Sequence, residues 1–220
     1  MNYKGLGTPF ETDSLKLYNC DCMELLRQTP DNYYSLALVD PPYGINVNVS
    51  MGRRKGDKKS DYHKFAGGDA CAPDAEYFNE LRRVSENQIV WGANHFISKM
   101  PFDSPCWIAW DKGFSDEVTF ATFELAWTSF TSTAKKFEGH PNAQDRIHPT
   151  QKPVKLYDWL LSKYAEKGQK ILDTHMGSGS IAIACHYAGC HLTASELDAD
   201  YYREACERIE RETRQTTMFD

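Results

Sequence analysis

The chain has 220 residues, of which 41% are hydrophobic and 13% aromatic, and its formal net charge is −6. This size and composition fit one folded domain with an ample core and exclude an intrinsically disordered chain. The acidic balance excludes a surface coated with basic charge, although a local basic patch could still contact nucleic acid. No apolar stretch is long enough to span a membrane and the polar N-terminus does not resemble a signal peptide, so we expect a soluble, cytoplasmic protein without a membrane partner.

The cysteines give no sign of a metal site or a disulfide framework. Their number is odd and their spacing lacks the two close pairs that are typical of a zinc site. Cys20 and Cys22 are one residue apart, which suits neither ligation nor a disulfide. We therefore expect reduced thiols and no bound metal. The seven cysteines are Cys20, Cys22, Cys71, Cys106, Cys185, Cys190 and Cys206.

The N-terminal part of the chain has the pattern of short strands and helices. Leu15 to Tyr18 alternates between apolar and polar residues, which predicts a strand. The residues from Asp74 to about Val84 predict a helix with Tyr77, Phe78 and Leu81 on one face. The other predicted elements are a helix around 23–27 and strands at 36–39, 88–91, 105–110 and 123–128.

The C-terminal part of the chain alternates between helices and strands. Pro153 stands where a helix tolerates proline, in the first turn, and Gly168 stands where that helix would end. Strands alternating with helices indicate a mostly parallel sheet that is covered on both faces. The predicted elements are strands at 171–172 and 191–195 and helices at 181–188 and 198–214.

The segment Asp40-Pro41-Pro42-Tyr43 directly follows the apolar strand at 36–39. Two prolines end the strand abruptly and stiffen the turn, because neither can donate to a sheet ladder. The turn places a carboxylate, a backbone carbonyl and an aromatic ring at the carboxyl end of a strand, where open α/β sheets bind ligands. This set suits a planar ring with an amino group, such as a nucleobase. An ordinary proline turn with a buried tyrosine is the alternative.

A basic stretch follows this turn. Between Met51 and Lys64 six basic residues face two acidic ones, and Gly52 and Gly56 predict a loop. A charge run of this kind often belongs to a solvated surface loop, but its position after the proline turn favours contact with DNA phosphates. The predicted DNA-binding residues are Arg53, Arg54, Lys55, Lys58 and Lys59.

The segment 170–180 predicts a strand, a tight turn with Gly177 and Gly179, and the start of a helix. Asp173 at the strand end could accept hydrogen bonds from a ligand ammonium group, and Glu196 could accept them from ribose hydroxyls. A dinucleotide fingerprint would need a third glycine, but position 182 is alanine. A free aspartate would also repel pyrophosphate. S-adenosylmethionine fits these residues better.

These motifs resemble those of the amino-methylating (N6-adenine/N4-cytosine) DNA methyltransferases of the Asp-Pro-Pro-Tyr type. Asp40-Pro-Pro-Tyr-Gly44 is similar to the catalytic motif and Asp173-Thr-His-Met-Gly-Ser-Gly179 to the cofactor motif, and His148-Pro-Thr-Gln-Lys-Pro153 stands before the latter. The catalytic motif comes first, which resembles the permuted beta class. The resemblance implies an α/β fold, a Rossmann-like sheet of seven strands with one antiparallel strand and helices on both faces.

The resemblance also implies the roles of single residues. Asp21 matches a position near the adenine of S-adenosylmethionine, and Lys152 and Pro153 match positions near its methionine end. The family usually has Pro-Phe where Thr174-His175 stand, so packing around the cofactor could differ. The implied catalytic residues are Asp40, Pro41, Pro42 and Tyr43, and the implied cofactor-binding residues are Asp21, Lys152, Pro153, Asp173, His175, Gly177, Ser178, Gly179 and Glu196.

The implied reaction transfers a methyl group from S-adenosylmethionine to the exocyclic amine of a base flipped out of double-stranded DNA. The Asp40 carboxylate and the Pro41 carbonyl would accept hydrogen bonds from the amine while Tyr43 stacks on the base. In this family aspartate at the first motif position goes most often with adenine, so adenine is expected and cytosine is the alternative. An RNA or a protein amide is a less favoured acceptor. A nicotinamide-dependent oxidoreductase and a non-catalytic nucleic-acid-binding protein are the other classes considered.

The similarity implies one methyltransferase domain over 1–220. Its catalytic half spans about 15–147, with a basic loop at 46–68, and its cofactor half spans about 148–214. The segment between Asp111 and Arg146, where this class often places target recognition, is short. The tail, 215–220, contains Gln215-Thr-Thr-Met-Phe219, which resembles the peptide with which bacterial proteins dock on the sliding clamp; a frayed tail is the alternative. Monomer and homodimer both remain open.

Overall fold

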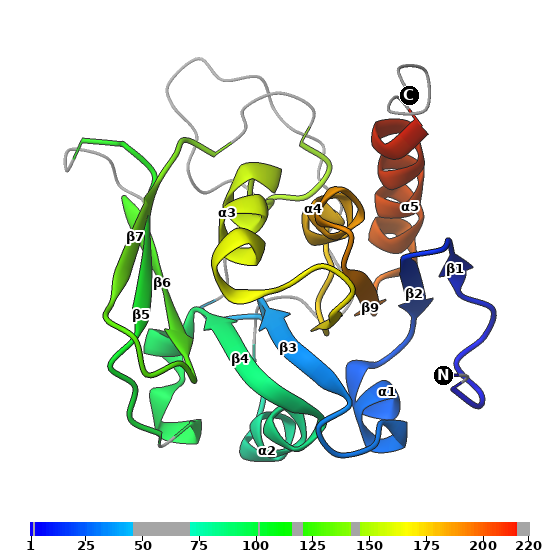
Figure 1. The fold of residues 1–220 in the computed structure, drawn as a ribbon, viewed down its shortest axis with the longest axis horizontal. Coiled ribbons are helices and arrows are strands. Elements are labelled where there is room, and N and C mark those ends of the chain that lie inside the picture. Colours follow the sequence, from blue (N-terminus) through cyan, green and yellow to red (C-terminus); the bar gives the residue numbers. More distant parts are fainter. Residues whose placement is uncertain (2, 46–70, 101, 116–120, 142–145, 215–220) are drawn as a thin grey trace.

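The fold was analysed in a computed structural model, which describes residues 1, 3–45, 71–100, 102–115, 121–141 and 146–214 (Figure 1). The basic loop residues Arg53, Arg54, Lys55, Lys58 and Lys59 and the tail from Gln215 to Phe219 lie outside the described residues. The predictions made for them therefore stay predictions.

The described chain contains nine strands, five α-helices and two short 3₁₀ helices (Figure 1). The strands are β1 (Phe10–Glu11), β2 (Leu15–Asn19), β3 (Tyr34–Val39), β4 (Ser85–Trp91), β5 (Trp107–Asp111), β6 (Phe123–Thr128), β7 (Lys135–Glu138), β8 (Lys170–Asp173) and β9 (His191–Glu196). The helices are α1 (Cys22–Gln28), α2 (Ala75–Val84), η1 (Ala93–His95), η2 (Ile97–Lys99), α3 (Val154–Tyr164), α4 (Ser180–Ala188) and α5 (Ala199–Arg214).

All nine strands belong to one sheet with the order β1-β2-β9-β8-β3-β4-β6-β5-β7. Strand β6 runs antiparallel to both of its neighbours, β4 and β5, and β1 runs antiparallel to β2; the other pairs are parallel. The seven strands expected from the sequence are all present, with β6 as the antiparallel one. The sheet differs from the expectation by the short edge strands β1 and β7.

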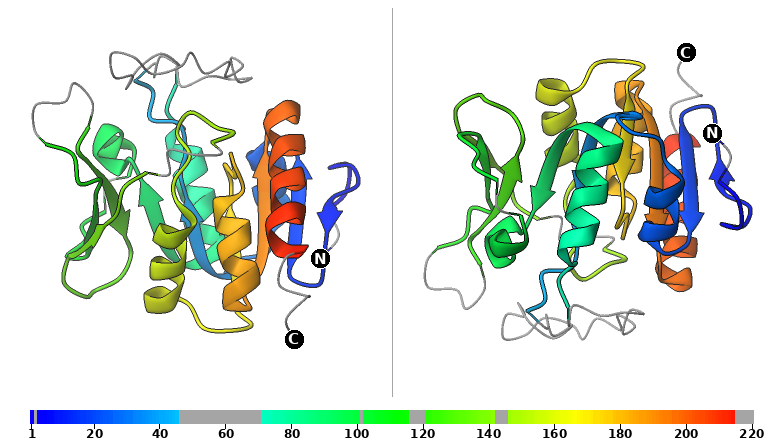
Figure 2. Two further views of the ribbon diagram at one scale, coloured as in Figure 1. Left: turned by 90° about the horizontal axis from the view of Figure 1, so that it is seen from above. Right: turned by 90° about the horizontal axis from the view of Figure 1, so that it is seen from below.

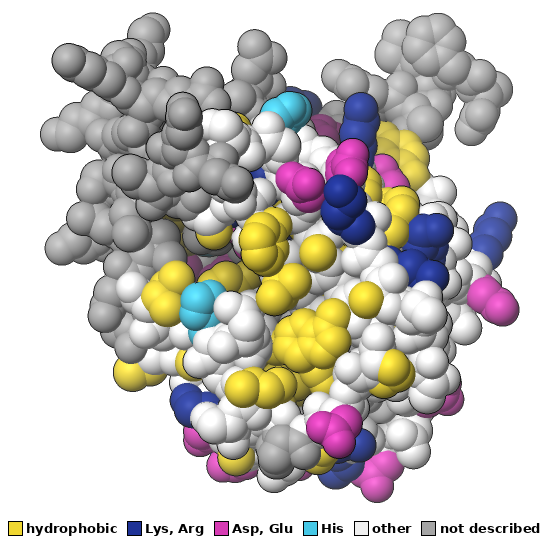
Figure 3. Space-filling view, turned by 90° about the vertical axis from the view of Figure 1, so that its left-hand side faces the viewer, with side chains coloured by type: hydrophobic (Ala, Val, Ile, Leu, Met, Phe, Trp, Pro, Cys, Tyr) yellow, Lys and Arg dark blue, Asp and Glu magenta, His cyan; other side chains and the backbone are white. Residues whose placement is uncertain are grey.

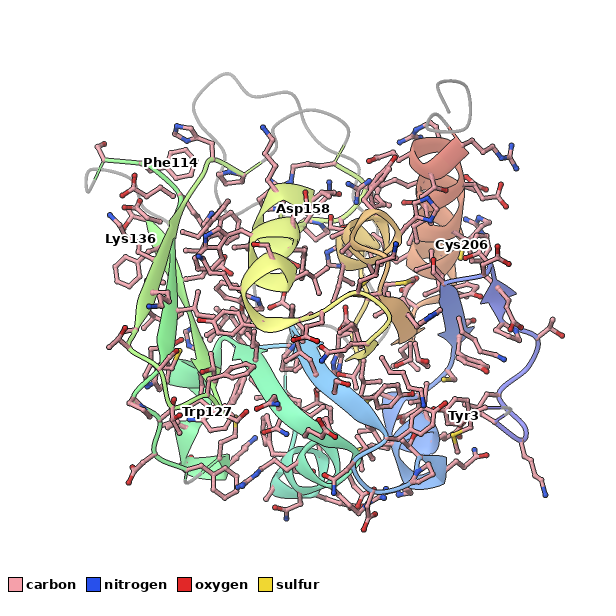
Figure 4. All side chains as sticks on the ribbon, in the orientation of Figure 1. Tyr3, Phe114, Trp127, Lys136, Asp158 and Cys206 are labelled. Carbon is pink, nitrogen blue, oxygen red and sulfur yellow. The ribbon has the colours of Figure 1, made fainter. Side chains whose placement is uncertain are left out.

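The helices form a layer on each face of the sheet (Figure 2). Helices α3, α4 and α5 cover one face, and α1 and α2 cover the other (Figures 1 and 2). Each face has its own hydrophobic core. In Figure 4, Cys206 belongs to the core under α3 to α5, and Tyr3 and Trp127 belong to the core on the side of α1 and α2. The doubly covered α/β fold predicted from the sequence is therefore confirmed.

Local sequence explains where several helices begin. The Asp21 carboxylate accepts a hydrogen bond from Met23 N at 2.8 Å and so caps α1, and Asp74 caps α2 through Tyr77 N at 3.1 Å. Helix α4 lies between Gly179 (φ 74°) and Gly189 (φ 68°). Both glycines adopt a left-handed conformation that other residues rarely adopt, so the glycine turn itself sets the start of α4.

Figure 3 shows the side of the molecule on which β7 lies, with hydrophobic side chains gathered at its centre and charged ones mostly toward its top and bottom. Phe137 of β7 and Trp159 of α3 are partly buried and pack with a ring-centroid distance of 5.5 Å. Within the described ranges, none of the helices has the length and apolar character that crossing a membrane requires.

Candidate active site

Predicted catalytic and cofactor residues lie close together at the carboxyl ends of the central parallel strands. Strands β3, β8 and β9 are parallel neighbours, with Ala37 opposite Leu172 and Asp173 opposite Ala194. Their carboxyl ends therefore lie side by side. Asp40 follows the end of β3, while Asp173 and Glu196 are the last residues of β8 and β9. This is the edge at which parallel α/β sheets bind ligands.

The Tyr43 side chain is folded back onto its own turn. Its hydroxyl donates a hydrogen bond of 2.8 Å to Asp40 Oδ1. The ring stacks on His95, with centroids 5.1 Å apart and an interplanar angle of 17°. It also packs on Gly92 (φ 69°), where an added Cβ would lie 2.1 Å from Tyr43 Cε1. Any other residue at position 92 would displace the tyrosine ring.

Asp40 is one end of a chain of buried and partly buried charges. Lys152 is buried and its ammonium contacts Asp40 Oδ2. The same ammonium lies 3.1 Å from Glu124 Oε2, and Lys112 Nζ lies 2.6 Å from Glu124 Oε1. Lys152, which the sequence placed at the cofactor, thus also contacts the predicted catalytic carboxylate. Its contact with a cofactor stays a prediction.

These contacts shift the pKa values of the charged groups. Burial and the nearby Glu124 carboxylate raise the pKa of Asp40, and the Lys152 ammonium opposes this rise. Burial disfavours the Lys152 ammonium, but the Asp40 and Glu124 carboxylates outweigh it and raise the pKa of Lys152. Burial also opposes ionisation of Glu124, yet the ammonium groups of Lys152 and Lys112 lower its pKa to about 2. Lys152 and Glu124 are therefore charged at neutral pH.

Hydrogen bonds within the segment before α3 fix the position of Lys152. Ile147 N donates to Gln151 Oε1 at 3.1 Å, and Gln151 N donates to His148 O at 3.2 Å. Thr150 N donates to His148 Nδ1 at 3.3 Å. These bonds fold the segment into a compact turn, from which Lys152 points inward rather than into solvent.

The glycine turn of the cofactor half is anchored from α5. Arg208 is buried and its Nη1 donates to Ser178 O at 2.9 Å and to Ser180 Oγ at 3.0 Å. An added Cβ at Gly179 would lie 2.8 Å from Ile209 Cδ1, so this glycine permits close packing on α5. Helix α5 thus holds the turn twice, through the Arg208 guanidinium and through the close contact of Ile209 with Gly179.

Asp173 and Glu196 differ in their hydrogen bonds. Asp173 is buried, accepts a 3.0 Å bond from His175 N, and burial raises its pKa to about 8. Among the described residues no cationic group lies within ion-pair distance of it. Glu196 is half-buried and accepts bonds from Gly177 N at 2.8 Å and Asp198 N at 3.0 Å. A buried carboxyl without a cation fits the ammonium group of S-adenosylmethionine, and the half-buried Glu196 retains lone pairs for hydroxyl donors.

Thr174 and His175, which stand where Pro-Phe is usual, form their own hydrogen-bonded group. Thr174 Oγ1 lies 2.9 Å from His175 Nδ1 and 2.6 Å from the Tyr77 hydroxyl. Burial lowers the pKa of His175 to about 4, so the imidazole is neutral at neutral pH. A neutral ring beside the glycine turn keeps the aromatic character that phenylalanine would provide.

Three residues of this site were not predicted from the sequence. Glu124 and Lys112 lie at the start of β6 and just after β5, and Gly92 follows β4. Gly92 had a usable signal, because a glycine directly after a buried strand can mark a close approach. Glu124 had none, because only the antiparallel direction of β6 brings its first residues to this edge.

Comparison with known proteins identifies the family of the chain. A model of the DNA methylase family that joins N6-adenine and N4-cytosine enzymes matches residues 85–207, more than half of the chain. The chain is 21% identical over 209 residues to the "Putative methylase YubD" of Escherichia coli (strain K12), covering 86% of this chain and 87% of that protein. It is 30% identical over 71 residues to the type II methyltransferase M.HpaI of Haemophilus parainfluenzae, covering 32% of this chain and 23% of that enzyme.

Solved methyltransferase structures have the same fold. The cytosine-N4-specific PvuII DNA methyltransferase superposes with a TM-score of 0.65 at 13% identity, covering 97% of this chain and 96% of that one. The M1.HpyAVI–SAM complex superposes with a TM-score of 0.61 at 16% identity, covering 89% and 98%.

The family model therefore identifies the class of the chain as a DNA methyltransferase that acts on amino groups. The chain belongs to the N6-adenine/N4-cytosine DNA methylase family, as its motifs predicted. Its family uses S-adenosylmethionine as methyl donor, which confirms the predicted cofactor. Family membership does not distinguish adenine from cytosine as the accepting base.

Proposed function

We propose that the protein methylates the exocyclic N6 amine of adenine in double-stranded DNA. The observation that carries the proposal is the placement of Asp40 and Asp173 at the carboxyl ends of neighbouring parallel strands. This placement puts a group that can bind an amine next to a group that can bind the cofactor. Close placement of two reactants can lower a barrier by about 7–11 kcal/mol.

Asp40 would activate the base. An exocyclic amine is a weak nucleophile because its lone pair is delocalised into the ring. Hydrogen bonds from the amine to the Asp40 carboxylate and the Pro41 carbonyl would favour a tetrahedral nitrogen with a free lone pair. The carboxylate would also stabilise the positive charge that develops on nitrogen before its proton is lost.

Tyr43 would hold the flipped base. Flipping costs a few kcal/mol, and stacking on an aromatic ring returns about 1–3 kcal/mol. In the structure His95 covers the Tyr43 ring. The imidazole, which is exposed, must therefore move aside before a base can take its place.

The cofactor half would hold the methyl donor. When bound, S-adenosylmethionine supplies an electrophilic methyl group on a sulfonium. The Asp173 carboxylate would accept from its ammonium group, Glu196 would accept from its ribose hydroxyls, and the turn at Gly177 and Gly179 would allow close approach of the backbone. Asp21, Lys152, Pro153, His175 and Ser178 complete the proposed cofactor site.

Adenine is favoured over cytosine by the aspartate at the first position of the Asp40-Pro41-Pro42-Tyr43 motif. Cytosine N4 methylation is the second candidate, because the PvuII enzyme with the same fold is cytosine-N4-specific. The mechanism at Asp40 would be the same for either amine.

The test is incubation with methyl-labelled S-adenosylmethionine and mixed-sequence duplex DNA, followed by digestion to nucleosides. We expect labelled N6-methyladenosine, and we expect none with Asp40→Ala. Labelled N4-methylcytosine would show instead that the accepting base is cytosine, the second candidate. Label in RNA or protein only, or wild-type turnover by Asp40→Ala, would overturn the proposal.

Two further predictions concern segments outside the described residues. We propose that Arg53, Arg54, Lys55, Lys58 and Lys59 contact DNA phosphates, in which case their replacement by glutamine should flatten the salt dependence of DNA binding.

We also propose that the tail from Gln215 to Phe219 binds the sliding clamp. Deletion of 215–220 should then abolish recovery of the protein with immobilised clamp, and no recovery of the intact chain would contradict it.

A further inference from the structure

Among the described residues, four charged side chains behind the Asp40 turn are linked by ion pairs. Lys152 bridges Asp40 and Glu124, and Lys112 binds the other oxygen of Glu124. Two ammonium groups thus balance two carboxylates. An unbalanced charge in such a site would cost several kcal/mol, so removal of any one member changes the charge that the other three experience.

We infer that Lys152 is a positioning residue that keeps the Asp40 carboxylate ionised and oriented toward the substrate amine, and that Glu124 and Lys112 hold Lys152 in place. The inference rests on the proposed function, because it gives Asp40 the amine as its partner. It adds two residues from β6 and from the end of β5 to the machinery of the reaction.

The first argument is the orientation of the carboxylate. Tyr43 donates to Asp40 Oδ1 at 2.8 Å and Lys152 contacts Oδ2, so both oxygens are fixed. Each carboxylate oxygen can accept a second hydrogen bond. Asp40 can therefore receive the amine without losing either partner, and the plane of its carboxylate is set before the base arrives.

The second argument is the way in which Lys152 is held. Its long side chain would lose considerable rotamer entropy on ordering, yet it is buried and its ammonium has three acceptors. Asp40 and Glu124 bind it on two sides, and the Tyr43 hydroxyl lies 3.3 Å from Nζ. Glu124 is in turn fixed by Lys112 at 2.6 Å. The ammonium has three donors, so this arrangement uses all of them.

The third argument is the charge balance around Asp40. Burial favours the neutral form of the Asp40 carboxyl, which accepts a hydrogen bond from an amine less strongly than the anion does. Lys152 favours the ionised form and Glu124 opposes it. Within the described part of the chain, the other titratable groups that interact with Asp40 come from the same turn, β8, α2 and α3, and they are Tyr43, Asp173, Tyr77 and Tyr157.

The inference predicts that substitutions of Lys152 and Glu124 shift the pKa of Asp40 in opposite directions. Lys152→Met removes the favourable charge and should move the acid limb of the methyl-transfer rate upward by about 1–3 pH units. Glu124→Gln removes a like charge without changing shape and should move the same limb downward. Lys152→Arg keeps the charge and should restore most of the rate that methionine loses. Lys136→Met is the matched control, since Lys136 lies on the outer strand β7 with an exposed ion pair to Asp111 (Figure 4).

The acid limb would be measured from single-turnover rates at saturating cofactor between about pH 5 and 9, with circular dichroism and cooperative thermal unfolding as the check that each variant is folded. A second readout is carbon NMR of ¹³C-labelled aspartate in the protein alone, in which the Asp40 carboxyl titrates without any reaction. If Lys152→Met does not fold, Glu124→Gln and Lys152→Arg still carry the test.

The outcomes separate this inference from the proposed function. Opposite shifts in both readouts, with Lys136→Met unchanged, would support it. Unshifted profiles in folded variants, or shifts of the same sign for Lys152→Met and Glu124→Gln, would overturn it while wild-type methylation leaves the proposed function intact. Absence of methylation by the wild-type protein would instead overturn the proposed function, and the NMR titration would still decide the role of Lys152.

Discussion

Asp40 and Asp173 lie on neighbouring strands at the same edge of the sheet, but only one of them carries its own cation. Lys152 contacts Asp40, whereas Asp173 has no cationic group within ion-pair distance among the described residues. Burial raises the pKa of Asp173 to about 8, and at Asp40 the Lys152 ammonium opposes the same effect. The protein therefore supplies a countercharge for Asp40, the aspartate that is proposed to bind a neutral amine.

This difference follows from the charge of each proposed ligand. The amine of a base is neutral, so a carboxylate that binds it must be ionised by the protein itself. The ammonium group of S-adenosylmethionine brings its own positive charge, so Asp173 can stay protonated until the cofactor arrives. The fold thus places two carboxyl groups in different electrostatic surroundings at the ends of adjacent strands, one beside a lysine and one without a nearby cation among the described residues.

The largest expected effect is at Asp40. Asp40→Asn keeps the shape of the side chain but loses the negative charge, and we expect the methyl-transfer rate to fall by at least about 10²–10³-fold. The cofactor affinity should change little, since Asp40 follows β3 and does not belong to the glycine turn. Single-turnover rates and calorimetric titration of the cofactor measure the two effects. A rate within a few-fold of wild type would contradict the role given to Asp40.

The second prediction concerns Asp173, where Asp173→Asn should weaken cofactor binding more than it lowers the rate. Loss of a charge-assisted hydrogen bond costs about 1.5–3 kcal/mol, so the cofactor should bind about 10–100-fold more weakly, while the rate at saturating cofactor should fall much less. In the wild type the bound ammonium needs an ionised carboxylate. Affinity should therefore rise with pH up to about 8 and then level off, and this rise should vanish in the variant.

Asp173 also predicts a pH dependence of stability. Between about pH 4 and 8 the folded protein holds a proton that the unfolded chain has released. The free energy of unfolding should therefore fall as pH rises through this range, which is the opposite of the usual effect of a paired aspartate. Denaturant titration at several pH values measures it. An equally steep fall in Asp173→Asn would assign the effect to another group.

The sequence predicts one part of this site well and another part poorly. Asp40, Asp173 and Glu196 each end an apolar strand, and the carboxyl ends of parallel strands meet at one edge, so their proximity follows from pattern alone. The contact between Lys152 and Asp40 does not, because no periodicity describes the turn from Ile147 to Gln151 that directs Lys152 inward.

The fold shows the same division. Seven strands have apolar or alternating runs and were predicted, but β1 and β7 have only two and four residues and few apolar side chains. They form because the edges of β2 and β5 offer unpaired backbone groups. The direction of β6 is likewise set by its neighbours and not by its own residues, which is why Glu124 could not be placed at the site in advance.

A smaller effect is expected at Arg208, which anchors the cofactor turn. Arg208→Met removes the bonds to Ser178 and Ser180, and we expect a loss of about 2–3 kcal/mol in the free energy of unfolding. Cofactor affinity should fall by about tenfold, with little change in DNA affinity. Arg203→Met on the same helix is the control, because Arg203 is exposed and its ion pair with Asp200 is worth little. Equal effects of the two variants would contradict the anchoring role.

The smallest expected effect concerns His95, which covers the ring that the base should use. An aromatic contact is worth about 0.5–1.5 kcal/mol, so His95→Ala should strengthen binding of an extruded base by about 2–10-fold. Fluorescence of 2-aminopurine at the target position, at a fixed DNA concentration, measures extrusion directly. His191→Ala, at the exposed start of β9, is the control. Weaker extrusion in His95→Ala would mean that the imidazole forms part of the base pocket. It would contradict the prediction that His95 occupies the position of the base on the Tyr43 ring.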